Sequence, residues 1–166
     1  MAIQLNIYTD ASHKRHVNYL GIGAYCKYNN IEYKLSSTVD ESMLLNYDIN
    51  EHTCSNPTAE YIAVAEILKK INKYKISPNT IIKFYSDYDG VQKWTNGSWK
   101  ARKSYIIKIK NFILKIIKDI GCHIEFIHVN GHSGILGNEL ADELAGMLDN
   151  VDNFDKLLSI IEDKSA

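Results

Sequence analysis

Four acidic residues stand at positions in this 166-residue chain where a solvated surface charge is not the expected choice. Asp10 and Asp87 end two strand-like runs, and in mixed α/β sheets ligands collect at the carboxyl ends of strands. Glu60 and Asp142 fall in the first turns of two predicted helices. Any one of these acids alone would most simply be a helix cap or a surface charge. As a set of four they point to a shared site.

The chemistry of such a site follows from the cost of bringing carboxylates together. Without a partner they repel one another and lose solvation, so they take up protons instead. A divalent cation removes that cost, and hard oxygen ligands suit Mg²⁺ or Mn²⁺. Two such ions held roughly 3.5–4 Å apart can activate a water and stabilise the leaving oxygen of an in-line phosphoryl displacement. The four acids therefore predict a metal-dependent nuclease.

The elements that must position these acids are predicted from hydrophobic periodicity and turn residues. Strands are predicted at 3–9, 20–28, 31–38, 80–86 and 123–129. Helices are predicted at 57–74, 88–95, 102–120, 138–148 and 152–162. Asn29-Asn30 is suited to a two-residue hairpin turn, because Asn tolerates positive φ. Residues 39–56 have no clean period and are expected to form a long loop, with room for a short helical insert.

The order of these elements indicates the fold class. Three strands joined by short connections suggest an antiparallel meander, and the later strands alternate with helices, which suggests parallel additions. We therefore expect an α/β fold with a mixed five-stranded sheet flanked by helices. Residues 1–150 form the expected catalytic domain. Residues 151–166 are expected to form a C-terminal helical extension that is packed on this domain or partly mobile.

The composition suits one globular domain and argues against several classes of protein. Apolar residues make up 45% and charged residues 23% of the chain, so a packed core is expected and wholesale disorder is not. No apolar run approaches the ~18 residues of a membrane span, and the N-terminus has no basic segment typical of a signal peptide. We expect a monomer without a membrane partner in the cytoplasm, or in the nucleus or an organelle if the source is eukaryotic.

The net charge of −1 conceals an asymmetry along the chain. Residues 91–118 include eight basic residues and no acidic ones, whereas residues 139–166 include eight acidic and two basic ones. Local fields steer binding, so a near-neutral total leaves a polyanionic partner open.

Five short motifs surround the four acids in a fixed order. They are Thr9-Asp10-Ala11-Ser12, Gly21-Ile22-Gly23-Ala24-Tyr25, Thr58-Ala59-Glu60, Tyr85-Ser86-Asp87, and a closing block that runs from Val129-Asn130-Gly131-His132-Ser133-Gly134 through Asn138-Glu139 to Ala141-Asp142-Glu143-Leu144-Ala145. In this order and spacing, over about residues 3–148, they resemble type 1 ribonuclease H. Residues 87–101 also look like the branch often found beside a viroplasmin-type hybrid-binding domain, which does not occur in these 166 residues.

The resemblance implies hydrolysis of the RNA strand of RNA–DNA hybrids, with two Mg²⁺ ions for which Mn²⁺ can substitute. It makes Asp10, Glu60, Asp87 and Asp142 the metal ligands. It also gives His132 a part in proton transfer or product release, whereas without the motif His132 would most simply cap a turn. Glu139 corresponds to a candidate second acid near the site, with its role in metal binding left open.

The resemblance also places substrate-binding residues. Ser12, Ser55 and Asn56 fall where the family contacts sugars or phosphates, although Asn56 would also serve as the N-cap of the helix that Pro57 opens. A basic-aromatic cluster suits DNA-strand phosphates and stacking on a sugar, and consists of Trp94, Trp99, Lys100, Arg102 and Lys103. The alternative for this cluster is a solvated lysine face with a core tryptophan. Residues 13–16 are open to the same two interpretations, phosphate contact or a solvated loop.

Three departures from the family pattern bear on substrate affinity more than on chemistry. Ala11 replaces the usual glycine, residues 39–56 are longer than the usual connection, and the basic segment from Trp94 to Lys103 is abbreviated. Two other functions compete with the hybrid-specific nuclease. One is another nuclease or strand-transfer enzyme of the same fold that acts on DNA, since fold alone does not set the substrate. The other is a nucleic-acid-binding module without activity.

Overall fold

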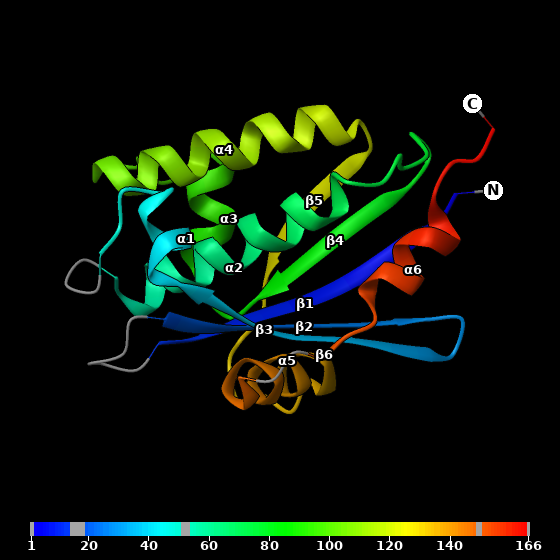
Figure 1. Cartoon of the computed structure of the whole chain (residues 1–166), viewed down its shortest axis with the longest axis horizontal. Helices are drawn as coiled ribbons and strands as arrows, with labels where there is room; N and C mark the ends of the chain where they lie inside the picture. Colours follow the sequence, from blue (N-terminus) through cyan, green and yellow to red (C-terminus); the bar gives the residue numbers. More distant parts are fainter. Residues whose placement is uncertain (1, 14–18, 51–53, 149–150, 166) are drawn as a thin grey trace.

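A mixed β-sheet forms the centre of the molecule, with helices on both of its faces (Figure 1). The computed structural model describes residues 2–13, 19–50, 54–148 and 151–165. Within these ranges the sheet has six strands in the order β5-β4-β1-β2-β3-β6. The strands are β1 (Gln4–His13), β2 (Tyr19–Tyr28), β3 (Ile31–Asp40), β4 (Ile81–Ser86), β5 (His123–His128) and β6 (Val151–Asp152). The helices are α1 (Glu41–Leu45), α2 (Asn56–Ile71), α3 (Asp89–Asn96), α4 (Ser104–Ile120), α5 (Leu136–Met147) and α6 (Phe154–Ile161).

The strand directions confirm the predicted meander with parallel additions. β1, β2 and β3 pair antiparallel, while β4 runs parallel to β1 and β5 parallel to β4. The hairpin between β2 and β3 turns at Asn29 and Asn30, whose φ angles of 50° and 62° are left-handed as the turn requires. The sheet has one strand more than the five predicted. β6 has two residues, too few to carry a periodic signal, and pairs only with Leu35 and Ser36 of β3.

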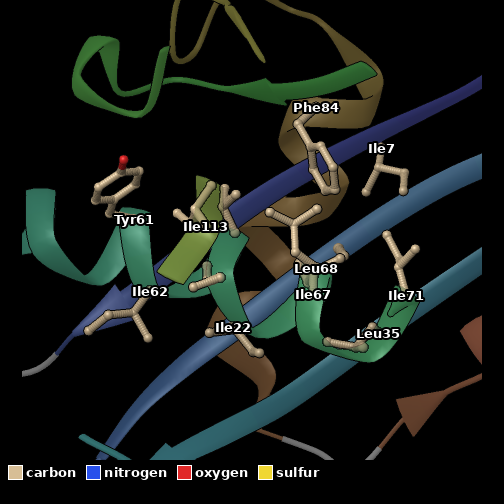
Figure 2. Packing of buried hydrophobic residues seen from close by; sticks show 14 of the residues in the cluster. Ile7, Ile22, Leu35, Tyr61, Ile62, Ile67, Leu68, Ile71, Phe84 and Ile113 are labelled. Carbon is tan, nitrogen blue, oxygen red and sulfur yellow. The ribbon is translucent and has the colours of Figure 1, made fainter. Parts of the chain in front are cut away.

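Helices α2 and α4 pack together over one face of the sheet and build the core (Figure 1). On α2 the buried stripe contains Val64, Ile67 and Ile71. On α4 a stripe of isoleucines at helical spacing is likewise buried, namely Ile106, Ile109, Ile113, Ile116 and Ile120. Figure 2 shows residues of α2 facing strand residues such as Ile7 and Phe84, both without exposed surface. This packing fixes α2, the helix that carries Glu60, against β1.

Helix α5 lies on the opposite face of the sheet, in close contact with β2 (Figure 1). Gly21 and Gly23 of β2 permit this approach because neither has a side chain. A Cβ atom at Gly23 would lie 2.2 Å from the carbonyl oxygen of Ala141, far inside van der Waals contact. The helix that carries Asp142 is therefore positioned by its backbone directly on the strand.

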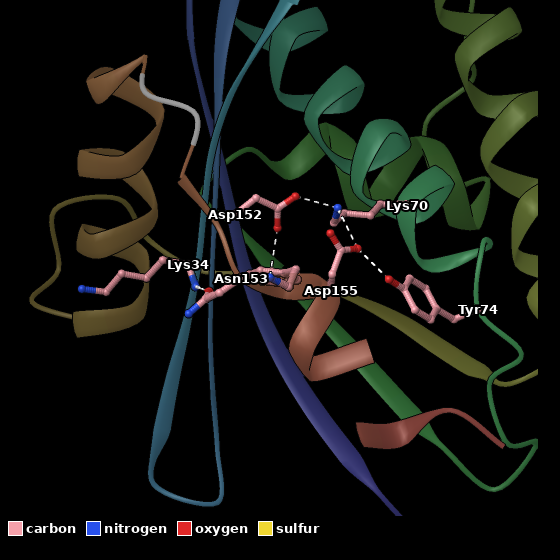
Figure 3. Close-up of polar contacts among 7 residues, drawn as sticks. Lys34, Lys70, Tyr74, Asp152, Asn153 and Asp155 are labelled. Atoms are coloured by element: carbon pink, nitrogen blue, oxygen red, sulfur yellow. Dashed lines mark hydrogen bonds and ion pairs between the residues drawn. The ribbon is translucent and has the colours of Figure 1, made fainter. Parts of the chain in front are cut away.

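The C-terminal segment passes the β3 edge of the sheet and returns to the α2 side (Figure 3). Lys70 of α2 forms ion pairs with Asp152 at 2.6 Å and with Asp155 at 3.1 Å. Tyr74 donates a hydrogen bond to Asp155 at 2.7 Å. The apolar face of α6 is buried in the same core as α2, and consists of Phe154, Leu157, Leu158 and Ile161. None of the described helices is long and apolar enough to cross a membrane.

Two local expectations are corrected. β1 does not end at residue 9 but continues to His13, so Asp10 lies within the strand, opposite Gly23. The strand runs on because β2 still pairs with it after the pairing with β4 has ended at Tyr8 and Tyr85. Asn56 is not the N-cap but the first residue of α2. Ser55 caps this helix by accepting from the Thr58 amide at 3.4 Å.

The connection between β3 and α2 contains the short helix α1, as the sequence allowed. Lys14, Arg15 and His16, for which phosphate contact and a solvated loop were both left open, lie outside the described residues. Of that stretch only His13 is described, at the end of β1.

Candidate metal centre

Three of the predicted acids meet at one place, and we call Asp10, Glu60 and Asp87 the acid group. Each offers a carboxylate oxygen, and these three oxygens lie within 4.8 Å of one another. Asp10 comes from β1, Glu60 from the first turns of α2, and Asp87 directly follows β4. Asp10 and Glu60 are only 4% and 8% exposed, so the group is largely shielded from water.

Asp142 lies at the rim of the acid group and is exposed on α5. Its carboxyl interacts with that of Asp10 and raises the pKa of Asp10, and its charge also raises the pKa of Asp87. The structure thus brings Asp142 into contact with Asp10 and near Asp87, although the described carboxylate oxygens that lie within 4.8 Å of one another do not include those of Asp142. Glu139 is exposed in the first turn of α5, and the cluster found among the described residues does not include it.

Burial dominates the electrostatics of the acid group. It raises the pKa of Asp10 to about 7 and the pKa of Glu60 well above its usual range. The two carboxyl groups interact, which lowers the pKa of Asp10 and raises that of Glu60, and the pair shares a proton. The pKa of Asp87 is raised by burial and by Asp142, and is held down by His132 and His128. Without a cation, the group therefore retains protons at pH values where carboxyl groups are normally ionised.

The backbone amide of Ala11 joins the two buried acids. It donates to Asp10 Oδ1 at 2.9 Å and to Glu60 Oε1 at 3.2 Å. Glu60 Oε2 is buried and accepts no hydrogen bond from any donor in the described part of the chain. A buried oxygen without a donor costs free energy, and a divalent cation bound by hard oxygens would remove that cost. These residues therefore fit a Mg²⁺ or Mn²⁺ site.

The loop between β5 and α5 brings His132 next to Asp87. A Cβ atom on Gly131 would lie 3.2 Å from Asp87 Oδ2, so this loop touches the carboxylate. His132 is exposed and has a left-handed φ of 55°, and its charge lowers the pKa of Asp87. Ser133 Oγ donates to the carbonyl of Asn130 at 2.6 Å and steadies the turn.

Two contacts of the site were missed by the sequence reasoning. The Ala11 amide is one, because a backbone donor leaves no signal in the side-chain pattern. The other is His128, whose ring contacts both the carbonyl oxygen of Asp87 and the carboxylate of Asp89. Only the register of β4 and β5, which places Ser86 opposite His128, shows this proximity.

A pocket of about 290 Å³ gathers most of the predicted basic-aromatic cluster. We call it the basic-aromatic pocket, and the predicted residues that line it are Ser55, Trp94, Lys100, Arg102 and Lys103. Tyr88 also lines it and directly follows Asp87, so the pocket borders the acid group. Ser12 and Asn56 do not line this pocket. Ser12 is half-buried in β1, opposite Gly21, and Asn56 is exposed on α2.

The two tryptophans of the cluster differ in their surroundings. Trp94 packs against the core, with its ring centroid 5.3 Å from that of Tyr61. Trp99 is 38% exposed, lies 6.2 Å from Trp94, and has Lys93 Nζ 5.0 Å from its centroid. Trp94 thus matches the alternative of a core tryptophan in part, while Trp99 presents a surface suited to stacking.

Comparisons with known proteins give the family and the fold of the chain. The family model described as RNase H matches residues 3–148. Ribonuclease HI of Haemophilus ducreyi is 30% identical over 148 residues, which cover 85% of this chain and 87% of that protein. The fold is similar to that of RNase H1 from the archaeon Halobacterium salinarum, with a TM-score of 0.66, 17% identity, and coverage of 87% of this chain and 96% of the other.

A second solved structure has a similar fold and was crystallised with nucleic acid. It is LC11-RNase H1 in complex with an RNA/DNA hybrid, with a TM-score of 0.65, 16% identity, and coverage of 86% of this chain and 97% of that one. At such identities the two structures show a common fold, whereas the family model spans most of the sequence. On this ground, the chain belongs to the RNase H family.

Proposed function

We propose that this chain is an endoribonuclease that hydrolyses the RNA strand of RNA–DNA hybrids by two-metal-ion catalysis, with Mg²⁺ as the working ion and Mn²⁺ able to replace it. The observation that carries the proposal is the acid group, in which three carboxylates from separate elements converge within 4.8 Å. The substrate class is supported by a relative named Ribonuclease HI and by the fold neighbour whose crystal contains an RNA/DNA hybrid.

Four side chains would hold the ions, namely the acid group together with Asp142. When bound, such ions lower the pKa of a coordinated water and neutralise charge on the phosphate. The proton that Asp10 and Glu60 share has to leave before both carboxylates can act as ligands, which links ion binding to pH. The Ala11 amide orients one oxygen of each acid and leaves Glu60 Oε2 available as a ligand. His132, exposed beside Asp87, would exchange a proton with the leaving oxygen of the cleaved strand.

The basic-aromatic pocket would bind the DNA strand of the hybrid. Lys100, Arg102 and Lys103 line it and are exposed, so they can contact phosphates, and Ser55 adds a hydroxyl at its wall. Trp99 would stack on a sugar beside the pocket. Ser12 and Asn56 remain proposed contacts to the RNA strand, whose 2′-hydroxyl is the group that distinguishes RNA from DNA.

The proposal also covers the oligomeric state and the location of the enzyme. All four acids come from one chain, which supports an active monomer. The location that we propose for it is the cytoplasm, or the nucleus or an organelle if the source is eukaryotic. Light scattering after size-exclusion chromatography would measure the molar mass, for which one chain corresponds to 18.9 kDa.

One assay tests the proposed reaction. The protein is incubated with a labelled RNA–DNA hybrid, double-stranded RNA or duplex DNA, each with Mg²⁺, Mn²⁺ or EDTA. We expect cleavage of the RNA strand of the hybrid with either ion, and none in EDTA. Cleavage of duplex DNA but not of the hybrid would overturn the proposal in favour of a DNA-acting enzyme of the same fold.

A further inference from the structure

The turn that follows β4 sets the direction of the Asp87 side chain. Ladder pairing between β4 and β5 ends with Ser86 opposite His128. Beyond that rung Val129 donates its amide to the Ser86 carbonyl at 2.9 Å, and Tyr88 donates its amide to Ser86 Oγ at 3.3 Å. Both of these bonds end on Ser86, so neither of them holds the Asp87 carbonyl.

The His128 side chain makes the hydrogen bond that holds the Asp87 carbonyl. Its Nε2 lies 3.2 Å from the carbonyl oxygen of Asp87, and its Nδ1 lies 2.8 Å from Asp89 Oδ1. A carbonyl oxygen only accepts hydrogen bonds, so Nε2 is the nitrogen that donates to Asp87. Asp89 is in turn paired with Lys93 Nζ at 3.2 Å, one turn further along α3. The His128 ring therefore connects the end of β5 to Asp87 and Asp89, the two acidic residues of the turn after β4.

We propose that His128, oriented by Asp89, is a positioning residue that fixes the Asp87 peptide and so directs the Asp87 carboxylate into the acid group. The inference rests on the proposed function, because it takes Asp87 to be a metal ligand. A residue just beyond a strand keeps two free backbone dihedrals unless its peptide is held. The His128 ring holds the Asp87 carbonyl on one side, and Gly131 closes against the Asp87 carboxylate on another.

The contact between His128 and the Asp87 peptide should act on ion binding directly and on catalysis through ion binding. Groups that orient metal ligands typically change metal affinity or activity by about 10- to 100-fold when they are removed. His128 itself would touch neither substrate nor reacting atoms. Its loss should therefore lower the affinity for divalent ions and kcat, with little change in KM for the hybrid.

The experiment compares three substitutions of His128 with a matched histidine on the same strand. His128→Phe removes both polar contacts, His128→Asn retains a donor only where Nδ1 stood, and His128→Gln retains one only where Nε2 stood. His123→Phe is the control, because His123 is exposed at the start of β5 and pairs with Glu125 at 2.7 Å. Calorimetry measures Mn²⁺ affinity without substrate, steady-state assays give kcat and KM for the hybrid, and unfolding in EDTA reports stability.

We expect Mn²⁺ to bind about 10- to 100-fold more weakly to His128→Phe and His128→Asn, and near the wild-type affinity to His128→Gln and His123→Phe. If His128→Phe does not fold, the Asn and Gln variants decide, since they differ only in which contact survives. Equal Mn²⁺ affinity in the Asn, Gln and wild-type proteins would overturn this inference alone. A wild-type protein that binds no Mn²⁺ and cleaves no hybrid would overturn the proposed function and this inference with it.

Discussion

Buried carboxyl groups that face one another keep a proton until a cation takes its place, and this exchange governs the acid group at the residue scale. Glu60 has one oxygen on the Ala11 amide and the other without a donor among the described residues. Asp87 is less buried, and while burial and Asp142 raise its pKa, its neighbours His132 and His128 act to lower it. The three acids therefore differ in what makes them metal ligands. Asp10 and Glu60 ionise when a cation supplies a counter-charge, whereas the Asp87 carboxylate has to be held in the right orientation.

Replacing Asp87 by Asn tests its assignment as a ligand. The amide has the same shape but no charge, so we expect hybrid cleavage in Mg²⁺ to fall by more than about 100-fold, while hybrid binding in EDTA is retained. Cleavage assays and gel-shift titrations measure the two properties. Asp119→Asn, an exposed acid in the last turn of α4, should change neither. Full activity in Asp87→Asn would remove this residue from the metal site.

The raised pKa of Asp10 predicts a pH-dependent stability of the ion-free protein. In the unfolded chain this carboxyl has its ordinary pKa of 3.8, and in the folded protein about 7, so the folded state holds the proton more strongly. Its contribution to stability is complete below pH 3.8 and is lost as the pH rises through about 7. Glu60 acts in the same direction.

Urea unfolding in EDTA at pH 5 and pH 8 measures this effect. The quantity to compare is the unfolding free energy of Asp10→Asn minus that of the wild type. This difference should be larger at pH 8 than at pH 5, by on the order of a few kcal/mol. Adding Mg²⁺ at pH 8 should restore stability to the wild type and less to the variant. The same difference between the two proteins at both pH values would refute the assignment of the raised pKa to Asp10.

The side-chain part of the site could be predicted from the sequence, whereas the backbone and register part could not. Asp10 and Asp87 stood out because each ends a strand-like run, and Glu60 because it falls in the first turns of a predicted helix. Ala11 acts through its amide, which every residue except proline has. His128 becomes a contact only through the pairing of β4 with β5, which links positions that nothing in the sequence associates.

At the scale of elements, the position of Asp142 depends on how closely α5 approaches β2. Gly23→Ala would place a Cβ atom 2.2 Å from the Ala141 carbonyl oxygen and 2.5 Å from the Ala145 amide nitrogen, both backbone atoms that cannot rotate away. We expect the unfolding free energy to fall by about 1–3 kcal/mol and the Mn²⁺ affinity to drop as α5 moves outward. Denaturant unfolding and calorimetry measure the two effects.

Gly146→Ala provides the matched control for this change. Gly146 is exposed on α5, and beyond its own helix backbone and chain neighbours no atom of the described residues lies within 4 Å of an added Cβ. Alanine should therefore raise stability by up to about 1 kcal/mol through helix propensity. A Gly23→Ala protein as stable as the wild type would show that α5 is not held by this contact.

The elements themselves were predictable where one period dominates. The isoleucine stripe of α4 and the Asn29-Asn30 turn illustrate this, since both are local in the sequence. The extension of β1 beyond Asp10 was not predictable, because it depends on β2 continuing to pair after β4 has ended. β6 likewise exists only as a partner of β3.

At the scale of the molecule, the sequence predicts a catalytic domain at 1–150 and a C-terminal extension at 151–166. We propose that this extension stabilises the domain and contributes no residue to the metal site. Leu157 is fully buried on α6, so Leu157→Ala should lower the unfolding free energy by about 2–5 kcal/mol. Ile160 is 57% exposed on the same helix and serves as the control. Ile160→Ala should change the unfolding free energy by less than about 0.5 kcal/mol. Both proteins should bind Mn²⁺ as the wild type does while folded. A loss of Mn²⁺ affinity in folded Leu157→Ala would contradict the proposal.

The strand order has a consequence for how the enzyme comes into being. β1 lies between β2, its neighbour in the chain, and β4, which is made only after all of α2. A growing chain can form the hairpin strands early, but it has no assembled acid group until β4 has left the ribosome and closed a long loop onto β1. Because Asp10, Glu60 and Asp87 come from distant parts of the chain, a chain that ends before β4 lacks a complete acid group, and we expect it to have no nuclease activity.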